Sequence, residues 1–167
     1  MPDALVVYAS VEGQTARIAE RIAARLRSFG HRVDLAPAGG ECDLSSYAGV
    51  IVGASVHYGH HPAWLASFLR KNRVAAARKS AFFSVSLSAN QRYAERFLGR
   101  ADWAPQFTAV FAGALRYSKY GPIKRFVIRA FAAIAGHDTD TSRDYDYTDW
   151  QAVDRFAAAF SRRLSSA

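Results

Sequence analysis

Short apolar runs alternate with amphipathic stretches along most of the chain. Residues 4–9 form a continuous apolar run, typical of a strand that is buried on both faces of a sheet. In the next stretch Ile18, Ile22 and Leu26 recur every four residues, as on the buried side of a helix, and Gly30 is placed to end that helix. The same pattern predicts further strands over 33–36, 49–54, 81–85 and 107–112, and helices over 63–69 and 91–98.

A last helix is expected near the C-terminus. Residues 148–151 match a capping box, in which Thr148 would cap the helix and Gln151 would be its third residue. Beyond them, Val153, Phe156 and Phe160 fall on one helical face, with Ala157 beside them.

These elements predict an α/β fold. Five strands interleaved with helices indicate a doubly wound five-stranded parallel sheet with helices on both faces. The one long interruption is the insert 116–147, between the fifth strand and the last helix, and a connection of that length is normally functional. We expect a single domain over 1–167.

The loop after the first strand is the first candidate binding site, because ligands of such sheets bind beyond the carboxyl ends of the strands. Residues 10–15, S-V-E-G-Q-T, lead directly into a helix whose N-terminal N–H groups favour an anion. The loop lacks G-x-G-x-x-G and the lysine of a nucleoside-triphosphatase loop. It suits a monophosphate ester, or it is an ordinary capped turn. In the first case Glu12 must point away, leaving the backbone amides and Ser10, Gln14 and Thr15 to bind.

Several segments carry a resemblance to a known family. The S-x-x-G-x-T turn between strand and helix resembles the phosphate loop of flavodoxin-like proteins, which bind FMN by its phosphate. Further segments resemble the menaquinone-dependent protoporphyrinogen IX dehydrogenases, in order and over essentially the whole chain. They are residues 52–60, 83–87, 112–117, 139–141 and 147–150.

The resemblance implies a flavodoxin-like fold and FMN as cofactor. It implies oxidation of protoporphyrinogen IX to protoporphyrin IX in haem synthesis, with menaquinone or a related quinone as acceptor. Because the flavin carries this chemistry, no catalytic side chain is assigned. The flavin ring would lie between the loops after the third and fourth strands, with Tyr58 available to stack and His57 to hydrogen-bond. The implied cofactor-binding residues are Ser10, Val11, Glu12, Gly13, Gln14, Thr15, Ala54, Ser55, Val56, His57, Tyr58, Gly59, Ser84, Val85, Ser86 and Leu87.

The insert is basic and aromatic. Its apolar residues Ile123, Phe126, Val127, Ala130, Phe131 and Ile134 form one helical stripe, with Arg125 and Arg129 roughly opposite. Such a helix either packs on its own sheet with a solvated basic face, or lies at a membrane interface with cations toward anionic head groups. The expected substrate, quinone or membrane contacts are Arg116, Tyr117, Lys119, Tyr120, Lys124, Arg125 and Arg129.

Charge narrows the choice of partner. The 167 residues include 22 Lys and Arg against 14 Asp and Glu, a net charge of +8, which favours an anionic partner such as an acidic membrane surface. No recognised nucleic-acid-binding signature is present, so no nucleic acid is expected. Two alternatives stay open: a flavodoxin-like electron carrier or general quinone reductase, and a non-catalytic basic module that binds anionic lipid or nucleic acid. Electron carriers are commonly acidic, so the charge counts against that one.

The remaining motifs suggest location rather than chemistry. The single cysteine, Cys42, in a predicted surface loop, excludes an internal disulfide and suggests a reducing compartment. We expect neither a signal peptide nor a transmembrane helix, and hence a cytoplasmic protein, peripheral on the inner face of the cell membrane. His57, His60 and His61 share a loop without a carboxylate or thiol to complete a metal site, so no metal is expected. The sequence leaves open whether the chain forms a homo-oligomer.

Overall fold

The computed structural model describes residues 3–40, 44–72 and 79–166. Five parallel strands form one sheet in the order β2-β1-β3-β4-β5, which confirms the predicted doubly wound architecture. Cys42 lies outside the described residues, so its place in a loop stays a prediction. The strands are β1 (Ala4–Ala9), β2 (Val33–Pro37), β3 (Gly49–Ser55), β4 (Ser80–Ser86) and β5 (Phe107–Ala112).

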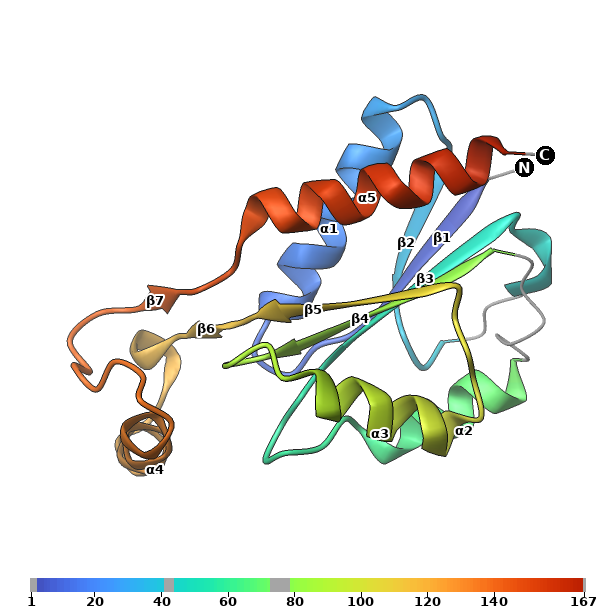
Figure 1. Ribbon diagram of the computed structural model, residues 1–167. Helices are drawn as coiled ribbons and strands as arrows, with labels where there is room; N and C mark the ends of the chain where they lie inside the picture. The colour runs from blue at the N-terminus through green and yellow to red at the C-terminus, as the bar shows by residue number, and fades with distance from the viewer. Residues whose placement is uncertain (1–2, 41–43, 73–78, 167) are drawn as a thin grey trace.

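Helices cover both faces of the sheet, with α1 and α5 on one side and α2 and α3 on the other (Figure 1). Successive strand residues point to opposite faces, so Val6 belongs to the core beneath α1 and α5, together with Ile22 and Phe160. Its neighbour Val7 belongs to the core beneath α2 and α3, together with Leu69. The helices are α1 (Gln14–Ser28), α2 (Ala63–Lys71), α3 (Gln91–Ala101) and α5 (Trp150–Ser165), with a 3-10 turn, η1, at Leu44–Ser46.

The insert forms a small layer of its own. Two short strands, β6 (Ala114–Leu115) and β7 (Tyr145–Asp146), pair antiparallel and carry the chain to and from a 3-10 turn, η3 (Tyr117–Lys119), and α4 (Pro122–Ile134). Figure 1 shows α4 at the end of this ribbon, away from the five-stranded sheet. A separate core holds the insert together, built from Leu115, Tyr117, Tyr120 and Ala132.

The exposure of α4 decides between the two readings of its sequence. Ala132 is its one fully buried residue among those described, and the apolar stripe faces outward. Helix α4 is therefore not packed on the sheet through that stripe, and the first reading is wrong. The exposed fractions are 82% for Ile123, 72% for Phe126, 57% for Phe131 and 84% for Ile134.

The start of α5 also differs from the prediction. Asp149 caps this helix by accepting a hydrogen bond from the Ala152 amide at 3.0 Å, so the assignment of Thr148 as the cap is wrong. The Thr148 hydroxyl instead donates to the Ala112 carbonyl at 2.8 Å and accepts from the Gln14 side chain at 2.8 Å. These two contacts with distant segments occupy the Thr148 hydroxyl, so the next residue, Asp149, caps α5.

Gly53 is required by the packing of β4 on β3. A Cβ at this position would lie 1.9 Å from the ring of Phe83, its register partner, whose side chain is fully buried. The ring has no free space to move into, so we expect Gly53→Ala to destabilise the protein by about 3 kcal/mol, measured by urea unfolding.

Gly99, exposed in the last turn of α3, is the matched control. Apart from its chain neighbours and the backbone of its own helix, no described atom lies within 4 Å of a Cβ built there, and the backbone is helical. Gly99→Ala should therefore stabilise the protein by roughly 0.5–1 kcal/mol. Equal effects of the two substitutions would contradict the role given to Phe83.

Candidate functional site

The carboxyl ends of β1, β3 and β4 lie side by side, because these strands are neighbours in the sheet. The chain runs from β1 to β2 on one side and returns to β3 on the other, so a crevice opens beyond β1 and β3. Three loops meet at this edge, formed by residues 10–13, 56–62 and 87–90.

The loop after β1 is shaped as a nest of amides. Gly13 has φ +91°, which a residue with a Cβ rarely adopts, and its N–H donates to the Ser10 hydroxyl at 3.0 Å. Helix α1 begins directly afterwards and has no acidic residue in its first turn. Its free N–H groups and dipole therefore make this corner favourable for an anion.

Thr15 supplies the most specific feature of this corner. Its side chain is 1% exposed, and its hydroxyl has no hydrogen-bond partner among the described residues. A buried hydroxyl without a partner costs free energy, and nearly all such groups in proteins are satisfied. A ligand with acceptor oxygens at the start of α1 would satisfy it.

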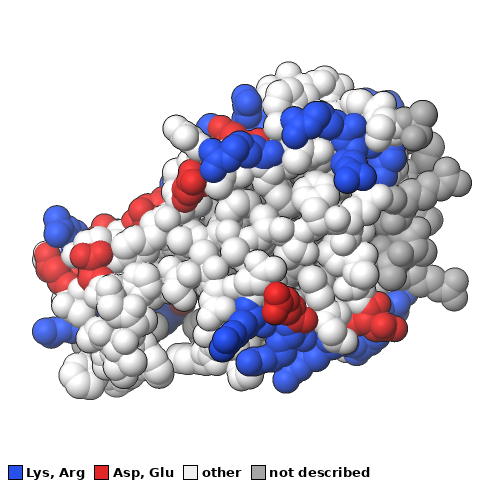
Figure 2. Space-filling view, in the orientation of Figure 1, with Lys and Arg blue, Asp and Glu red and all other residues white. Residues whose placement is uncertain are grey.

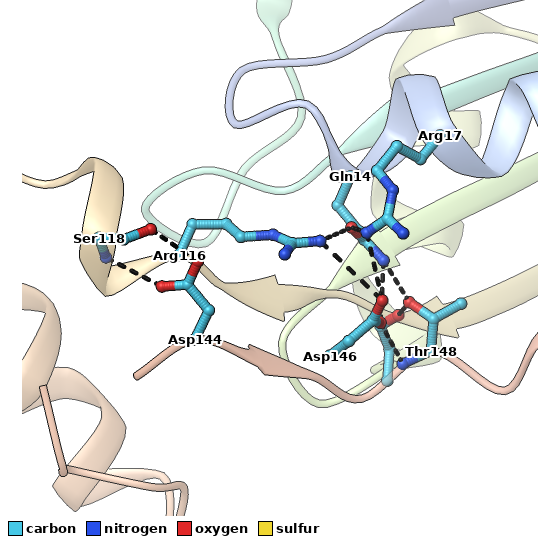
Figure 3. A network of polar contacts seen from close by, with 8 residues as sticks. Gln14, Arg17, Arg116, Ser118, Asp144, Asp146 and Thr148 are labelled. Atoms are coloured by element: carbon cyan, nitrogen blue, oxygen red, sulfur yellow. Dashed lines mark hydrogen bonds and ion pairs between the residues drawn. The ribbon is translucent and has the colours of Figure 1, made fainter. Parts of the chain in front are cut away.

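Gln14 ties the loop to the insert instead of leaving its side chain for a ligand (Figure 3). Its Nε2 donates to Asp146 Oδ1 at 3.0 Å and to Thr148, while its Oε1 accepts from Arg17 at 3.0 Å and from Arg116 at 3.1 Å. The expectation that this side chain binds a phosphate is thus replaced by a structural role. No local pattern pointed to the contacts of Gln14 with Arg116, Asp146 and Thr148, which lie more than 100 residues away along the chain.

Asp146 is the acidic centre of that network. Burial raises the pKa of its carboxyl group, but hydrogen bonds from Thr148 and Gln14 and the charge of Arg17 outweigh this, so the pKa is lowered. The carboxylate is also 3.3 Å from the Arg17 guanidinium. It therefore stays charged and links β7 to the first turn of α1.

Glu12 is directed toward α4. Its carboxylate accepts from Lys124 Nζ at 2.5 Å, and Lys124 also lies over the ring of Tyr120, 4.8 Å from its centroid. The acid is thus neutralised by a cation of the insert, as its place in an anion site requires. Lys124 is correspondingly engaged in a contact within the chain, although its side chain stays 40% exposed.

The loop after β3 is a tight hairpin. His57 and His60 exchange backbone hydrogen bonds of 2.8 and 3.1 Å, and Tyr58 between them has φ +48°. Positive φ at a bulky residue is strained, and it presents the Tyr58 ring to solvent, 66% exposed. This ring is available to stack on a flat ligand.

Several residues that the sequence assigned to the cofactor site at the strand ends have other positions in the structure. Ala54, Ser84 and Val85 are buried in the sheet, so their side chains do not face the crevice. Leu87 packs against the core of the insert. Ser86 is buried too, where its hydroxyl accepts from the Asn90 amide at 3.0 Å and shapes the loop after β4.

His61 connects the loop after β3 to the ends of strands β3 and β4, a role that the sequence did not reveal. Its Nδ1 is 3.0 Å from the Ser55 carbonyl and its Nε2 is 3.0 Å from the Ser84 hydroxyl. The carbonyl accepts, so Nδ1 carries the proton and Nε2 accepts from Ser84. Burial lowers the pKa of His61 to about 4, against a smaller opposing effect of the Ser55 bond. The ring is neutral at physiological pH and cross-links the ends of β3 and β4.

A neutral buried histidine predicts acid sensitivity. The unfolded chain binds a proton at His61 below its usual pKa near 6.5, whereas the folded protein does so only near 4. The contribution of His61 to the free energy of unfolding is therefore fully present above pH 6.5. It falls by up to about 3 kcal/mol as the pH drops toward 4. Urea unfolding at pH 7 and pH 5 should show this loss in the wild type and a smaller one in His61→Gln. Equal losses would contradict it.

The insert residues assigned to ligand or membrane contacts are placed differently from one another. Tyr117 is fully buried and Tyr120 is 6% exposed, so both belong to the insert core and the assignment of these two as contacts is wrong. Arg125 donates to the Tyr120 carbonyl at 3.2 Å. Arg116 and Lys119 line a hollow of about 330 Å³ together with Glu12, Gly13, Gln14 and Arg17, whereas Arg129 is exposed on α4.

Comparison with known proteins agrees with this architecture. The family model of the flavodoxin domain matches residues 5–142. The chain is 35% identical to the protoporphyrinogen IX dehydrogenase (quinone) of Escherichia coli strain K12, over 92% of this chain and 91% of that protein. It is also 35% identical to the enzyme of the same name from Leishmania major, over 96% of this chain and 75% of that one.

Solved structures support the fold alone. A flavodoxin from the domain Archaea superposes with a TM-score of 0.61 at 16% identity, over 98% of this chain and 99% of that chain. The oxidised flavodoxin 2 of Bacillus cereus gives 0.59 at 21% identity, over 96% and 99%. The flavodoxin-like fold expected from the sequence is confirmed.

Proposed function

Because this chain belongs to the flavodoxin family, and within it to the protoporphyrinogen IX dehydrogenases, we propose that it binds FMN and oxidises protoporphyrinogen IX with a quinone as acceptor. The relatives are named for that substrate and for a quinone. The similarity extends over nearly the whole of this chain, the insert included. The choice of FMN among flavins rests on the loop after β1.

The unpartnered Thr15 hydroxyl is the observation that supports FMN most directly. It lies at the start of α1, beside the Gly13 turn and the hydroxyl of Ser10. A phosphate monoester has acceptor oxygens for this hydroxyl and for the free amides of the loop. Ser10, Gly13 and Thr15 would hold the phosphate, and the hairpin around Tyr58 would contact the ring.

FMN, when bound, supplies the redox chemistry, since a flavin accepts two electrons from one substrate and gives them to another. Conversion of protoporphyrinogen IX to protoporphyrin IX removes six electrons and six protons, so three quinones become three quinols. The protein contributes binding and alignment. His61 connects the loop after β3 to the end of β4, and the Gln14–Asp146 contacts hold the insert beside the phosphate corner.

Anaerobic turnover is the decisive experiment. Protein reconstituted with FMN is mixed with protoporphyrinogen IX and menadione, and porphyrin fluorescence is followed against a sample without protein. We expect porphyrin to appear with three menadione molecules consumed for each. A flavodoxin-like electron carrier would bind FMN but give no porphyrin above the blank, and that result would overturn the proposed activity.

We propose further that the protein works on the inner face of the cell membrane, with menaquinone or a related quinone as the acceptor. The support is the outward-facing apolar stripe of α4, together with the net charge of +8. White atoms cover most of the insert's lower end in Figure 2, with few charged groups among them. In the described part of the chain, no helix has both the length and the apolar character needed to cross a bilayer.

A further inference from the structure

A groove of about 390 Å³ runs between α2 and α3, on the sheet face opposite α1 and α5. Ala63, Ala66 and Phe97 form its apolar lining, and the small side chains of the two alanines allow an apolar ligand to approach closely. Gly59, His60 and His61 close one end, so the groove begins at the hairpin that follows β3. It therefore adjoins the site proposed for the flavin.

Arginines from both helices also line this groove. Arg96 and Arg100 project from α3 one turn apart, and Arg70 faces them from α2, where it donates to the Arg100 carbonyl at 2.5 Å and to Ser67 at 3.3 Å. Figure 2 shows Lys and Arg along the lower edge of the molecule, over α2 and α3, with some Asp and Glu among them.

These arginines lack acidic partners. No described carboxylate lies within ion-pair distance of Arg96 or Arg100, and both are exposed. On the opposite face, Arg21 does have such a partner, since it lies 2.8 Å from Asp154. Like charges four residues apart destabilise a helix, so a free arginine pair beside an apolar groove is explained by an anionic ligand. Guanidinium groups match the planar geometry of carboxylates.

We propose that the groove between α2 and α3 binds the carboxylate arms of the tetrapyrrole substrate, with Arg96 and Arg100 as the carboxylate-binding residues. This inference rests on the proposed function, which supplies a ligand that is largely apolar and carries two carboxylates. The groove matches both properties, since an apolar floor lies beside a basic rim. The groove ends at residues 59–61 in the loop after β3, so a ligand bound there would lie next to the site proposed for the flavin ring.

The test uses the FMN-loaded protein and two stable probes, protoporphyrin IX and its dimethyl ester, which has the same ring without the carboxylates. The double variant Arg96→Ala/Arg100→Ala removes the proposed contacts. Arg162→Ala/Arg163→Ala, two exposed arginines on α5, is the matched control for the loss of charge. Binding is followed by porphyrin fluorescence, and turnover by the menadione assay.

We expect the Arg96/Arg100 variant to bind protoporphyrin IX about 10-fold more weakly and to show a KM raised by a similar factor, with kcat and FMN affinity little changed. The dimethyl ester should bind the variant and the wild type equally. Unchanged protoporphyrin binding, or equal losses in the α5 control, would overturn the inference.

Binding of the variants to anionic vesicles tests whether these arginines contact lipid head groups instead. If the Arg96/Arg100 variant loses vesicle binding but retains porphyrin binding, the arginines serve lipid head groups and the inference is wrong. The proposed function fails separately, when wild-type protein gives no porphyrin from porphyrinogen. Porphyrin binding would still be measured in that case, so the two failures are distinguishable.

Discussion

Serine at Ile123, Phe126, Phe131 and Ile134 together is expected to release the protein from lipid vesicles. Each of these side chains is more than half exposed, and partial immersion in a bilayer interface contributes on the order of 1 kcal/mol per large apolar side chain. Four such losses amount to about 4 kcal/mol, or roughly a 1000-fold weaker partition into vesicles. Sedimentation with vesicles of mixed anionic and zwitterionic lipid measures this directly.

The fold should survive the change, because these side chains do not contribute to the insert core. Thermal unfolding of the quadruple variant is expected to match the wild type within a few degrees. Phe29→Ser, at the far end of α1 and 43% exposed, is the matched control, and it should leave vesicle binding intact. If the quadruple variant still sediments with vesicles, α4 is not the membrane contact.

The layered fold was predictable from the sequence because its strands and helices have different hydrophobic periods. Strands buried on both faces are continuous apolar runs, and the helices that cover them repeat every three to four residues. Each predicted strand is present, with bounds that differ by at most one residue. The helix expected over 91–98 extends to Ala101, because Phe97 and Ala101 both pack on the sheet.

The orientation of the insert was not predictable. Periodicity shows that α4 is amphipathic, but it does not show which face meets the protein. Contacts of Ala132 in the insert core decide this, and the pairing of the two-residue strands β6 and β7 beside that core leaves no periodic signal. The same pairing buries Tyr117 in a tyrosine cluster, with Tyr145 6.3 Å away between ring centroids. A tyrosine in a basic loop suggested a ligand contact, whereas the structure makes it the core of the insert.

Contacts between distant segments account for the other differences. From the sequence, Thr148 has a plausible local role as a helix cap and Gln14 as a phosphate ligand. In the structure their side chains form a hydrogen bond with each other instead. His61 likewise looked like part of a histidine cluster in a loop, and its role depends on two strand ends that the fold brings together. Local patterns identified the elements that meet at the site but not these side-chain pairings.

Thr15→Val is expected to weaken FMN binding by about 10- to 100-fold. The substitution keeps the shape of the side chain and removes the hydroxyl that is buried at the start of α1 without a partner. A hydrogen bond to a charged group contributes about 1.5–3 kcal/mol, which gives that range. Quenching of flavin fluorescence on titration of the apoprotein measures the affinity. Because valine leaves no unsatisfied buried oxygen, the apoprotein itself should be as stable as the wild type or slightly more so.

Riboflavin serves as the internal control for this prediction, since it carries the same ring without the phosphate. Wild type and Thr15→Val should bind riboflavin with equal affinity, and Thr15→Ser, which restores the hydroxyl, should recover most of the FMN affinity. If the variant loses riboflavin and FMN affinity to the same extent, Thr15 either contacts the flavin ring or stabilises the loop, and the proposed contact with the phosphate is wrong. The phosphate corner is therefore tested by a difference between two ligands, and this difference is independent of how tightly either binds.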